Sequence, residues 1–489
     1  MDMLALSFLI VASVFFLVFV LISATFIGLW LSEIGLWVSW IPIFLVIASV
    51  YFLIRDYLVP FDILSVVFIG VSIGLNIFTT LRLFVPFVEV YATNNYLKKA
   101  MENSLGKDYL EYVDPFISSR FSKNVRFRLS HYFIGVRTKA LEKRVGTIKD
   151  VVYKKEDNQE LKLNIHYPKR NGKFSTLIFI HGGGFVIGSK DNPKSDRICK
   201  LLANYGYVVF NVDYRLAPLS FIKKETSLIE DLIICDMVSD IRASIVFASK
   251  NTETYNGIPE ELFLFGRSAG GHLALITAFS CLGKFFELKD SDRSIKEHEI
   301  LGVVAFYPIT NFTKLYDYYG KQNLLKYLLY KGAGGTPEEF QYLYQVFSPT
   351  SYLSEINCKE IPPVFLATGE KDKLVAPEQS KLLYSKLQTL GVESVMLDLP
   401  WANHGFDTVL NGPGGQLALK YLSQFLVWVL TKYKLRKIEE LAKKRGLGNI
   451  VSKEKYRMLH KLKKQNFDKE QDMNQFLPFI EYFYEETDE

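Results

Sequence analysis

Three long uncharged stretches open the chain. Residues 3–32, 34–54 and 63–81 contain no Asp, Glu, Lys or Arg, and each approaches or exceeds the roughly 20 apolar residues that cross a bilayer. We therefore predict three transmembrane helices, at about residues 4–31, 34–54 and 62–82. The alternative is a cleaved secretory signal followed by buried core helices. A signal has a basic start and an apolar stretch of about 7 to 15 residues, whereas the only charge before the first stretch is Asp2.

The pattern changes after the third stretch. Residues 91–145 are mixed, aromatic and basic, and we interpret them as a helical connector. Apolar residues then alternate on both sides of the segment KKEDNQE, which predicts an antiparallel hairpin. Short apolar runs follow, separated by helical segments. The expected strands are 175–180, 207–214, 261–266, 300–308, 363–369 and 394–400, and the expected helices are 193–205, one ending near 249, one after 270, 377–390 and 416–430.

This alternation predicts a mostly parallel sheet with helices on both faces, an α/β domain over residues 146–432. An insertion of about residues 312–350, rich in Tyr, Phe and Leu, interrupts it. Because long connections in compact domains are usually functional, we expect a helical cap over the site. Extra helices that merely pack there would give the same pattern.

Charge divides the chain unevenly. The net charge is +6, yet the first 90 residues carry −3, so the remainder carries +9. Much of that excess lies in a predicted basic helical tail, residues 433–489, which ends acidic. Such a tail can bind anionic lipid headgroups or be a solvated helical face. No nucleic-acid module accompanies it.

Lys and Arg near the span ends favour the cytoplasmic side of a membrane. Arg82, Lys98 and Lys99 follow the third span, whereas the opposite side has only Arg55. We therefore expect a multi-pass membrane protein with its large domain facing the cytoplasm. The four cysteines are scattered, with no CxxC pair, and they add little evidence on the compartment of the large domain.

A serine flanked by glycines follows one of the expected strands. Gly266-Arg267-Ser268-Ala269-Gly270 has the Gly-x-Ser-x-Gly pattern of a nucleophile elbow, a sharp strand-to-helix turn that presents a serine hydroxyl. A Gly-rich turn with an exposed serine would look the same. Two further residues favour a catalytic role for this serine. Asp372 and His404 each follow the end of another strand, in the order Ser, Asp, His. We therefore expect Ser268 as nucleophile, His404 as base and Asp372 as the acid that orients it, with Glu370 as a competitor for the acid role.

The segment HGGGF, residues 181–185, supplies candidate donors for an oxyanion. We expect the backbone N–H groups of Gly183, Gly184 and Ala269 to form the oxyanion hole. A phosphate loop is the alternative, but the Gly-Lys-Ser/Thr continuation is missing. His181 is interpreted as a loop-positioning residue. The candidate substrate-binding residues, drawn from the same motifs, are Phe185, Arg267 and Tyr214.

Together, HGGGF, DYRLAP (213–218), GRSAGG (266–271), GEKDKL around Asp372 and HGF at His404 resemble the hormone-sensitive-lipase-like branch of the α/β-hydrolase esterases, over roughly residues 145–430. The resemblance implies an α/β-hydrolase fold and carboxylic ester hydrolysis without a metal or organic cofactor. Two features depart from it. First, that branch usually has Asp before the nucleophile, and Arg267 at this position makes an anionic substrate group conceivable. Second, the N-terminal spans and the basic tail are unlike the soluble members of the branch.

The sequence thus predicts a membrane-anchored serine esterase or lipase. The expected partners are a small-molecule or lipid ester, and membrane lipids that contact the N-terminal spans and the basic tail. One alternative is a serine peptidase of the same fold, although the chain has no room for the large propeller domain of the oligopeptidases. The other is a non-catalytic binding protein, which would be expected to lack a triad member.

Overall fold

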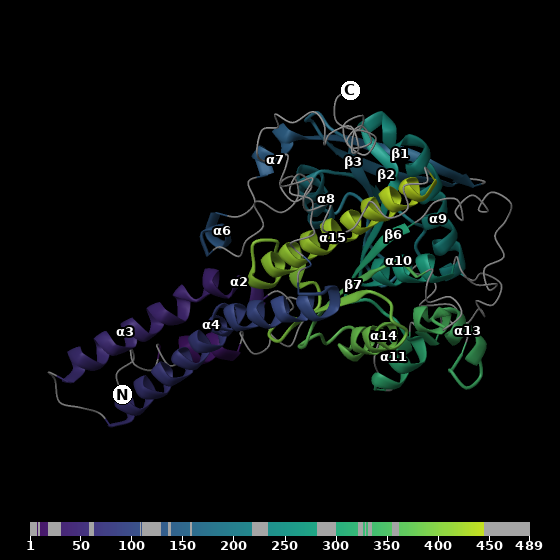
Figure 1. Cartoon of the computed structure of the whole chain (residues 1–489). Helices are drawn as coiled ribbons and strands as arrows, with labels where there is room; N and C mark the ends of the chain where they lie inside the picture. Colours follow the sequence, from purple (N-terminus) through teal and green to yellow (C-terminus); the bar gives the residue numbers. More distant parts are fainter. Residues whose placement is uncertain are drawn as a thin grey trace, which may run out of the picture.

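The computed structural model describes residues 31–57, 63–107, 138–156, 159–217, 233–280, 300–320, 335–354 and 361–444, with Tyr109 and shorter stretches inside 7–17, 129–134 and 326–330. A globular α/β domain and two long helices that project from it make up this part of the chain (Figure 1). Most of the first predicted span, 4–31, and the tail after residue 444 lie outside the described residues.

One eight-stranded sheet forms the centre of the globular domain. Its strands lie in the order β1-β2-β4-β3-β5-β6-β7-β8. The pairs β1–β2 and β2–β4 are antiparallel, and the other pairs are parallel. The strands are β1 (Val145–Glu156), β2 (Gln159–Pro168), β3 (Phe174–Ile180), β4 (Tyr207–Val212), β5 (Gly257–Arg267), β6 (Ile300–Phe306), β7 (Val364–Gly369) and β8 (Ser394–Leu399). The predicted hairpin and mostly parallel sheet are confirmed, and this topology fits the α/β-hydrolase fold.

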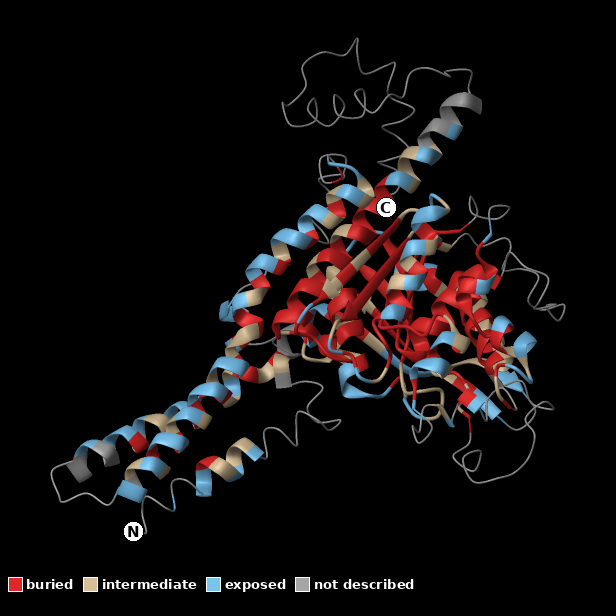
Figure 2. Cartoon of the chain, turned by 90° about the horizontal axis from the view of Figure 1, so that it is seen from below, coloured by how far each residue is buried: buried red, intermediate tan, exposed pale blue. Residues whose placement is uncertain are grey.

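The parallel strands are apolar throughout because both of their faces are covered. In β5, Phe263 and Phe265 face one helical layer, whereas Leu262 and Leu264 face the other. The first layer contains α8 (Pro193–Tyr205), α15 (Pro413–Lys444) and part of α4 (Ile63–Leu105), and the second contains α9 (Ile233–Asn251), α10 (Ala269–Ser280) and α14 (Glu378–Thr389). Figure 2 shows the sheet and its covering helices as the buried part of the molecule.

Helix α4 changes the predicted domain boundaries. Instead of ending near residue 82, it continues as one helix to Leu105, with Pro86 inside it. Val90, Leu97 and Met101 on its second half are buried in the core beside β8. The first part of the predicted connector is therefore a core helix of the α/β domain, because these apolar side chains cover one edge of the sheet.

The second predicted span is broken. Helix α2 (Leu31–Val38) and α3 (Trp40–Tyr57) meet at Ser39 with a bend of 41°. Within the described residues one helix, Val66–Leu105, is long and apolar enough to cross a membrane, and the bent pair makes at most a second. Three spans are therefore not shown.

The predicted boundary at residue 433 lies inside a helix. Helix α15 runs without a break from Pro413 to Lys444, so the start of the basic tail continues the core helix. The expected lipid contact of the rest of that tail lies outside the described residues.

Candidate active site

Ser268 lies at the sharp turn between β5 and α10. Its φ of +52° is in the left-handed region, where a non-glycine residue is strained. The flanking glycines permit this turn. A Cβ on Gly266 would lie 2.0 Å from the carbonyl oxygen of Gly270, and one on Gly270 would lie 2.2 Å from that of Ile180. The pattern Gly-x-Ser-x-Gly is thus required by backbone contacts on both sides of the serine.

Three side chains predicted from separate strand ends meet here. The Ser268 hydroxyl lies 3.0 Å from Nε2 of His404, and Nδ1 of His404 lies 2.7 Å from Oδ2 of Asp372. The other carboxylate oxygen of Asp372 accepts hydrogen bonds from the backbone N–H groups of Leu374 and Val375, both at 2.8 Å. Because an ionised carboxylate only accepts, Nδ1 of His404 carries the proton and Nε2 is left as the acceptor for the serine hydroxyl.

Glu370 lies apart from this chain of hydrogen bonds. Its carboxylate forms an ion pair with Lys381 at 2.5 Å and a hydrogen bond with Asp398. That bond, together with Lys381, lowers the pKa of Glu370. Burial raises the pKa of Asp398 to about 7, and Glu370 adds to the rise. The contact with His404 is therefore made by Asp372 and not by Glu370.

The glycine loop after β3 runs against the nucleophile elbow. A Cβ on Gly182 would lie 3.2 Å from the Cβ of Ser268. Gly183 and Gly184 have φ angles of +139° and +60°, and the Gly183 carbonyl accepts the N–H groups of Val186 and Ile187. Ala269 is the first residue of α10, so its N–H has no partner inside that helix. These positions are compatible with the expected oxyanion hole.

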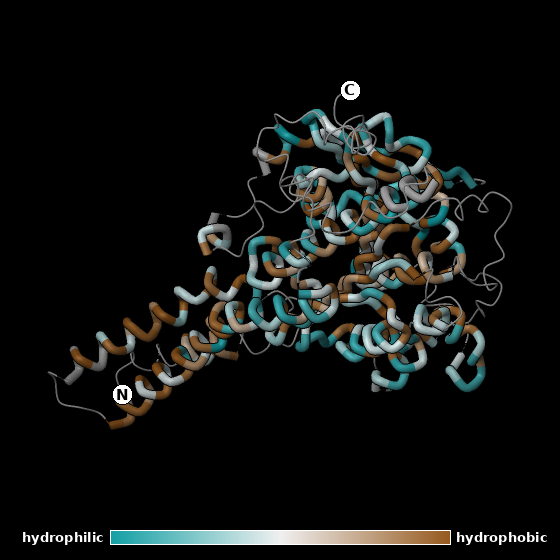
Figure 3. The backbone as a smooth tube through the Cα atoms, in the orientation of Figure 1, coloured by the Kyte–Doolittle hydropathy of each residue, from teal (hydrophilic) through white to brown (hydrophobic). Residues whose placement is uncertain are grey.

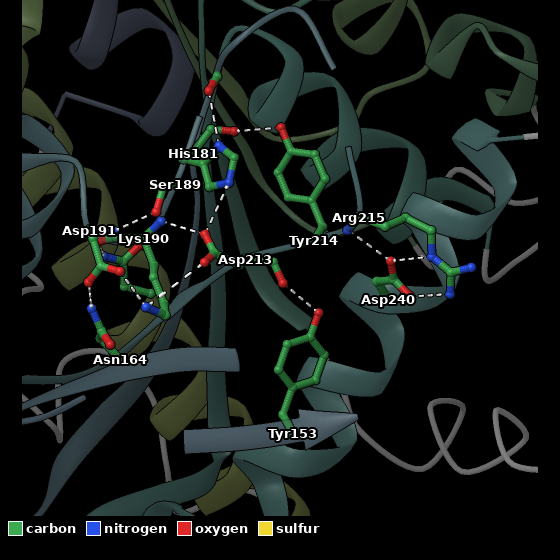
Figure 4. A network of polar contacts seen from close by, with 12 residues as sticks. Tyr153, Asn164, His181, Ser189, Lys190, Asp191, Asp213, Tyr214, Arg215 and Asp240 are labelled. Atoms are coloured by element: carbon green, nitrogen blue, oxygen red, sulfur yellow. Dashed lines mark hydrogen bonds and ion pairs between the residues drawn. The ribbon is translucent and has the colours of Figure 1, made fainter. Parts of the chain in front are cut away.

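Tyr214 packs against this loop. Its hydroxyl donates to the carbonyl oxygen of His181 at 3.0 Å, and its ring stacks on the His181 imidazole with 4.5 Å between centroids. Nε2 of His181 lies 3.5 Å from Asp213. Figure 4 shows the tyrosine, the histidine and the aspartate in this arrangement. The contact that the structure shows for Tyr214 is thus with His181, and its expected substrate contact stays a prediction, whereas His181 lies where a positioning residue would.

A buried lysine holds the other end of the loop. The Lys190 ammonium contacts Asp150 at 2.8 Å and Asp191 at 2.5 Å, and the Lys190 backbone N–H donates to Asp213 at 2.5 Å. Burial alone would lower the pKa of Lys190, but the hydrogen bonds to Asp150 and Asp191 raise it. Figure 4 shows Lys190 beside Asp191 and Asp213. The aspartate of the DYRLAP motif, Asp213, therefore joins the glycine loop to the buried Lys190, whose ammonium is paired with the more exposed Asp150 and Asp191.

Arg267 is also placed differently from the expectation. Its guanidinium is buried in an ion pair with Asp407 and lies over the ring of Phe179 at 5.4 Å. The Tyr307 hydroxyl donates to the same carboxylate at 2.5 Å. Because its charge is satisfied internally, Arg267 does not lie where it would meet an anionic substrate group.

Tyr307 and Asp407 were not identified from the sequence. The Tyr307 ring packs on the His404 ring with 4.3 Å between centroids. Burial raises the pKa of Tyr307 well above its usual value, and Asp407 raises it further, so the phenol stays a donor. The available signal was the arginine before the nucleophile, because a buried arginine needs a carboxylate partner.

Phe185 lies between the glycine loop and the insertion. Its φ is +68°, and its ring contacts His272 at 5.4 Å and Phe312 at 6.4 Å between centroids. Phe312 begins α11 (Phe312–Tyr318), which packs with α13 (Gln341–Val346) in a separate apolar cluster. The insertion is thus helical and borders the glycine loop where it is described.

The insertion also contacts the loop that carries Asp372. The Tyr319 hydroxyl donates to the carbonyl oxygen of Leu374, two residues after Asp372. Within the described ranges, no group of three or more His, Cys, Asp and Glu side chains could hold a metal ion.

Comparison with known proteins finds similarity to esterases over a region that includes part of this site. Residues 163–387 match the family model described as BD-FAE, a region that includes Ser268 and Asp372 and ends before His404. The chain is 28% identical over 226 residues to the acetyl esterases of Salmonella typhi and of Salmonella paratyphi B. Each alignment covers 44% of this chain and 59% of the relative.

Solved structures with a similar chain course include an esterase from Thermogutta terrifontis and esterase B from Lactobacillus rhamnosis. The first has a TM-score of 0.44 and 23% identity, covering 58% of this chain and 92% of that one. The second has a TM-score of 0.47 and 22% identity, covering 64% of this chain and 94% of that one.

Proposed function

We propose that the protein is a serine carboxylesterase. The observation that carries the proposal is the continuous hydrogen-bonded series from the Ser268 hydroxyl through His404 to Asp372, at 3.0 and 2.7 Å. It is the geometry of a nucleophile, a base and an orienting acid. The similarity to acetyl esterases supports the same chemistry.

In the proposed reaction, Ser268 Oγ attacks the ester carbonyl carbon while His404 Nε2 takes the hydroxyl proton. Asp372 holds the imidazole by accepting from Nδ1 and stabilises the charge that forms on it. The N–H groups of Gly183, Gly184 and Ala269 donate to the oxyanion. The tetrahedral intermediate collapses when His404 returns the proton to the leaving alcohol. Water then attacks the acyl-enzyme by the same route and releases the acid.

We further propose that α3 and the first half of α4 enter a membrane. On α3, Phe44, Ile47, Tyr51 and Ile54 are each more than 60% exposed, and Figure 3 shows both projecting helices as largely hydrophobic. Such a run of exposed apolar side chains is unusual for a water-facing surface.

Polar residues lie between the same two helices. Ser49 and Ser72 are buried, with their hydroxyl oxygens 3.3 Å apart, and buried Asn76 donates to the Ser72 carbonyl. Polar groups inside and apolar groups outside are the arrangement of helices packed in lipid. A membrane position favours acylated or lipid-like esters as substrates. The charge bias of the sequence favours a cytoplasmic domain.

The test is hydrolysis of p-nitrophenyl esters from acetyl to palmitoyl by the full-length protein in detergent. Ser268→Ala is compared with Ser385→Ala, a serine on the exposed side of α14. We expect turnover that Ser268→Ala lowers by several orders of magnitude and Ser385→Ala leaves unchanged.

The chain-length optimum distinguishes a short-acyl esterase from a lipase. Turnover that survives in Ser268→Ala would disprove the mechanism. A wild-type protein that neither hydrolyses esters nor reacts with a fluorophosphonate would instead indicate a binding protein, and cleavage confined to peptides would indicate a peptidase.

A further inference from the structure

We infer that Glu33, a residue of the N-terminal helices, positions the loop that carries His404. This inference rests on the proposed function, because it assigns Glu33 a role in that reaction. The sequence placed Glu33 as an isolated charge between two spans. In the structure its side chain is fully buried against the α/β domain.

The Glu33 carboxylate contacts two separate segments of that domain. Oε1 accepts a hydrogen bond from the Trp401 indole N–H at 3.1 Å, and Oε2 accepts one from the Gly414 backbone N–H at 2.8 Å. Gly414 lies in the first turn of α15, so the carboxylate caps that helix and lies at the positive end of its dipole. One side chain thus joins the start of α15 to the segment after β8.

The domain is shaped to accept this carboxylate. A Cβ on Gly412 would lie 2.4 Å from Glu33 Oε2, and one on Gly414 would lie 2.8 Å from Oε1. Glycines therefore leave the space that the carboxylate occupies. In the part of the chain that the structure describes, no basic side chain forms an ion pair with Glu33. Burying a carboxylate without a nearby cation costs free energy. We therefore infer that the hydrogen bonds of Glu33 have a specific role.

Helix α2 is held in place independently of Glu33. A Cβ on Gly35 would lie 2.4 Å from the Leu83 carbonyl oxygen, which shows how closely α2 packs on α4. The Trp37 backbone N–H donates to the Tyr132 hydroxyl at 3.3 Å, and the Tyr132 carbonyl accepts from Asn411 at 2.6 Å. Figure 1 shows α2 beside the beginning of α15.

Trp401 connects this contact to the active site. It belongs to the same loop as His404, between β8 and the short helix η7 (Phe406–Thr408). In that loop the Ala402 carbonyl accepts the Lys371 N–H at 2.9 Å, and the Asn403 side chain accepts the N–H groups of Lys373 and His404. The loop that Glu33 holds through Trp401 therefore also fixes Asp372 relative to His404.

In Glu33→Gln the amide oxygen replaces only one of the two carboxylate acceptors, so the amide NH2 faces the other buried N–H donor and the link between Trp401 and Gly414 is broken. His404 would then be less well placed toward Ser268. Because misplacement of about 1 Å can cost about 100-fold in rate, we expect Glu33→Gln to lower kcat about 10- to 100-fold for p-nitrophenyl acetate, with KM changed less than about threefold. Glu102→Gln is the matched control. Among the ion pairs of the described residues, Glu102 pairs only with Lys98, at 3.7 Å on the same helix.

A double-mutant cycle with Trp401→Phe tests the route. Phenylalanine keeps the ring and removes the indole N–H. If Glu33 acts through Trp401, Glu33→Gln with Trp401→Phe should lower kcat no further than the more severe single variant. Multiplicative losses, or an unchanged kcat in a folded Glu33→Gln protein, would overturn the inference.

Amide hydrogen exchange provides a readout that does not depend on activity. We expect Glu33→Gln to raise exchange at least tenfold over residues 400–416 and to leave β3 and β4 unchanged. Equal exchange in wild type and variant would overturn the inference, whether or not the protein hydrolyses esters. The opposite result is also informative. If Glu33→Gln speeds exchange in this loop but turnover does not need Ser268, the Glu33 contact is supported and the proposed function fails. If Glu33→Gln is too unstable to purify, kcat and amide hydrogen exchange are measured on Trp401→Phe alone.

Discussion

Arg267 and Asp407 form a buried ion pair that ties the residue before Ser268 to the third residue after His404. Removing one partner of such a pair leaves an uncompensated buried charge. We therefore expect Asp407→Asn to lower the free energy of unfolding by about 3 to 5 kcal/mol, measured by denaturant or thermal unfolding in detergent.

Replacing both partners separates the cost of an unpaired charge from lost packing. Arg267→Met with Asp407→Leu should be closer to wild type in stability than Asp407→Asn alone, because no charge then remains buried. A loss below about 1 kcal/mol in Asp407→Asn would show that the ion pair contributes little.

Asp372 and Glu370 differ in what they contact, and the two corresponding amides should differ in activity. Asp372→Asn keeps the size of the side chain but favours the wrong tautomer of His404, a change that costs about 10⁴ in kcat in serine proteases. Glu370→Gln should stay within about threefold of wild type, because Glu370 contacts Lys381 and Asp398. Equal losses in the two variants would contradict the assignment of the acid.

Gly270 should tolerate no side chain. A Cβ there would lie 2.2 Å from the Ile180 carbonyl oxygen, so Gly270→Ala must move either the elbow or the glycine loop. We expect loss of fluorophosphonate labelling at Ser268 and a lower melting temperature. At Gly320, where a Cβ meets nothing within 4 Å, alanine should leave both quantities close to wild type.

Acid should destabilise the fold partly through His272. Burial lowers the pKa of His272 from its usual 6.5 to about 4, so the unfolded chain binds this proton more readily than the native one. Stability is then highest above pH 6.5 and falls as the pH drops toward 4, by about 3 kcal/mol for a shift of this size.

The comparison is the melting temperature of wild type and His272→Asn between pH 7 and pH 4.5. Asparagine can still donate to the Ile309 carbonyl, as His272 Nδ1 does at 3.1 Å, but it does not titrate. The variant should lose less stability on acidification. His166, whose pKa burial also lowers to about 4, acts in the same direction, so part of the dependence should remain. Identical slopes would show that His272 makes no contribution.

Charges placed on the projecting helices should weaken membrane binding. Phe44 and Ile47 are exposed on α3, and a charged residue at the centre of a spanning helix costs about 2.5 to 3.5 kcal/mol. Phe44→Asp with Ile47→Asp should reduce recovery of the protein with phosphatidylcholine vesicles in flotation. Leu382→Asp, on the exposed side of α14, should not. Equal recovery of all three proteins would argue against insertion of α3.

The sequence predicted the sheet and the meeting of Ser268, Asp372 and His404 because both depend on local signals. Buried parallel strands are continuous apolar runs, and their carboxyl ends share one edge of the sheet. Contacts between distant residues had no such signal. Trp401 lies 368 positions from Glu33, and Asp407 is one of many acidic residues that could have paired with Arg267.

The same limit applies at the N-terminus. Hydropathy identifies apolar residues without showing what covers them, so it did not show that Val90, Leu97 and Met101, beyond the predicted third span, pack beside β8. The break at Ser39, where α2 meets α3, comes three residues before Pro42 in the first turn of α3, a helix signal that hydropathy alone does not register. A position beside a motif does not reveal the direction of a side chain, so the sequence did not show that Arg267 contacts Asp407 and that Tyr214 contacts His181.

The length of α4 sets a geometric limit on the proposed enzyme. Its 43 residues form a rod of about 65 Å, roughly twice the hydrocarbon thickness of a bilayer. One half projects with α3, whereas the other half is buried beside β8. With the projecting half in lipid, the domain would stand at a fixed height above the surface, unable to swing on a tether. The distance between a bilayer ester and Ser268 would then be set by this one helix.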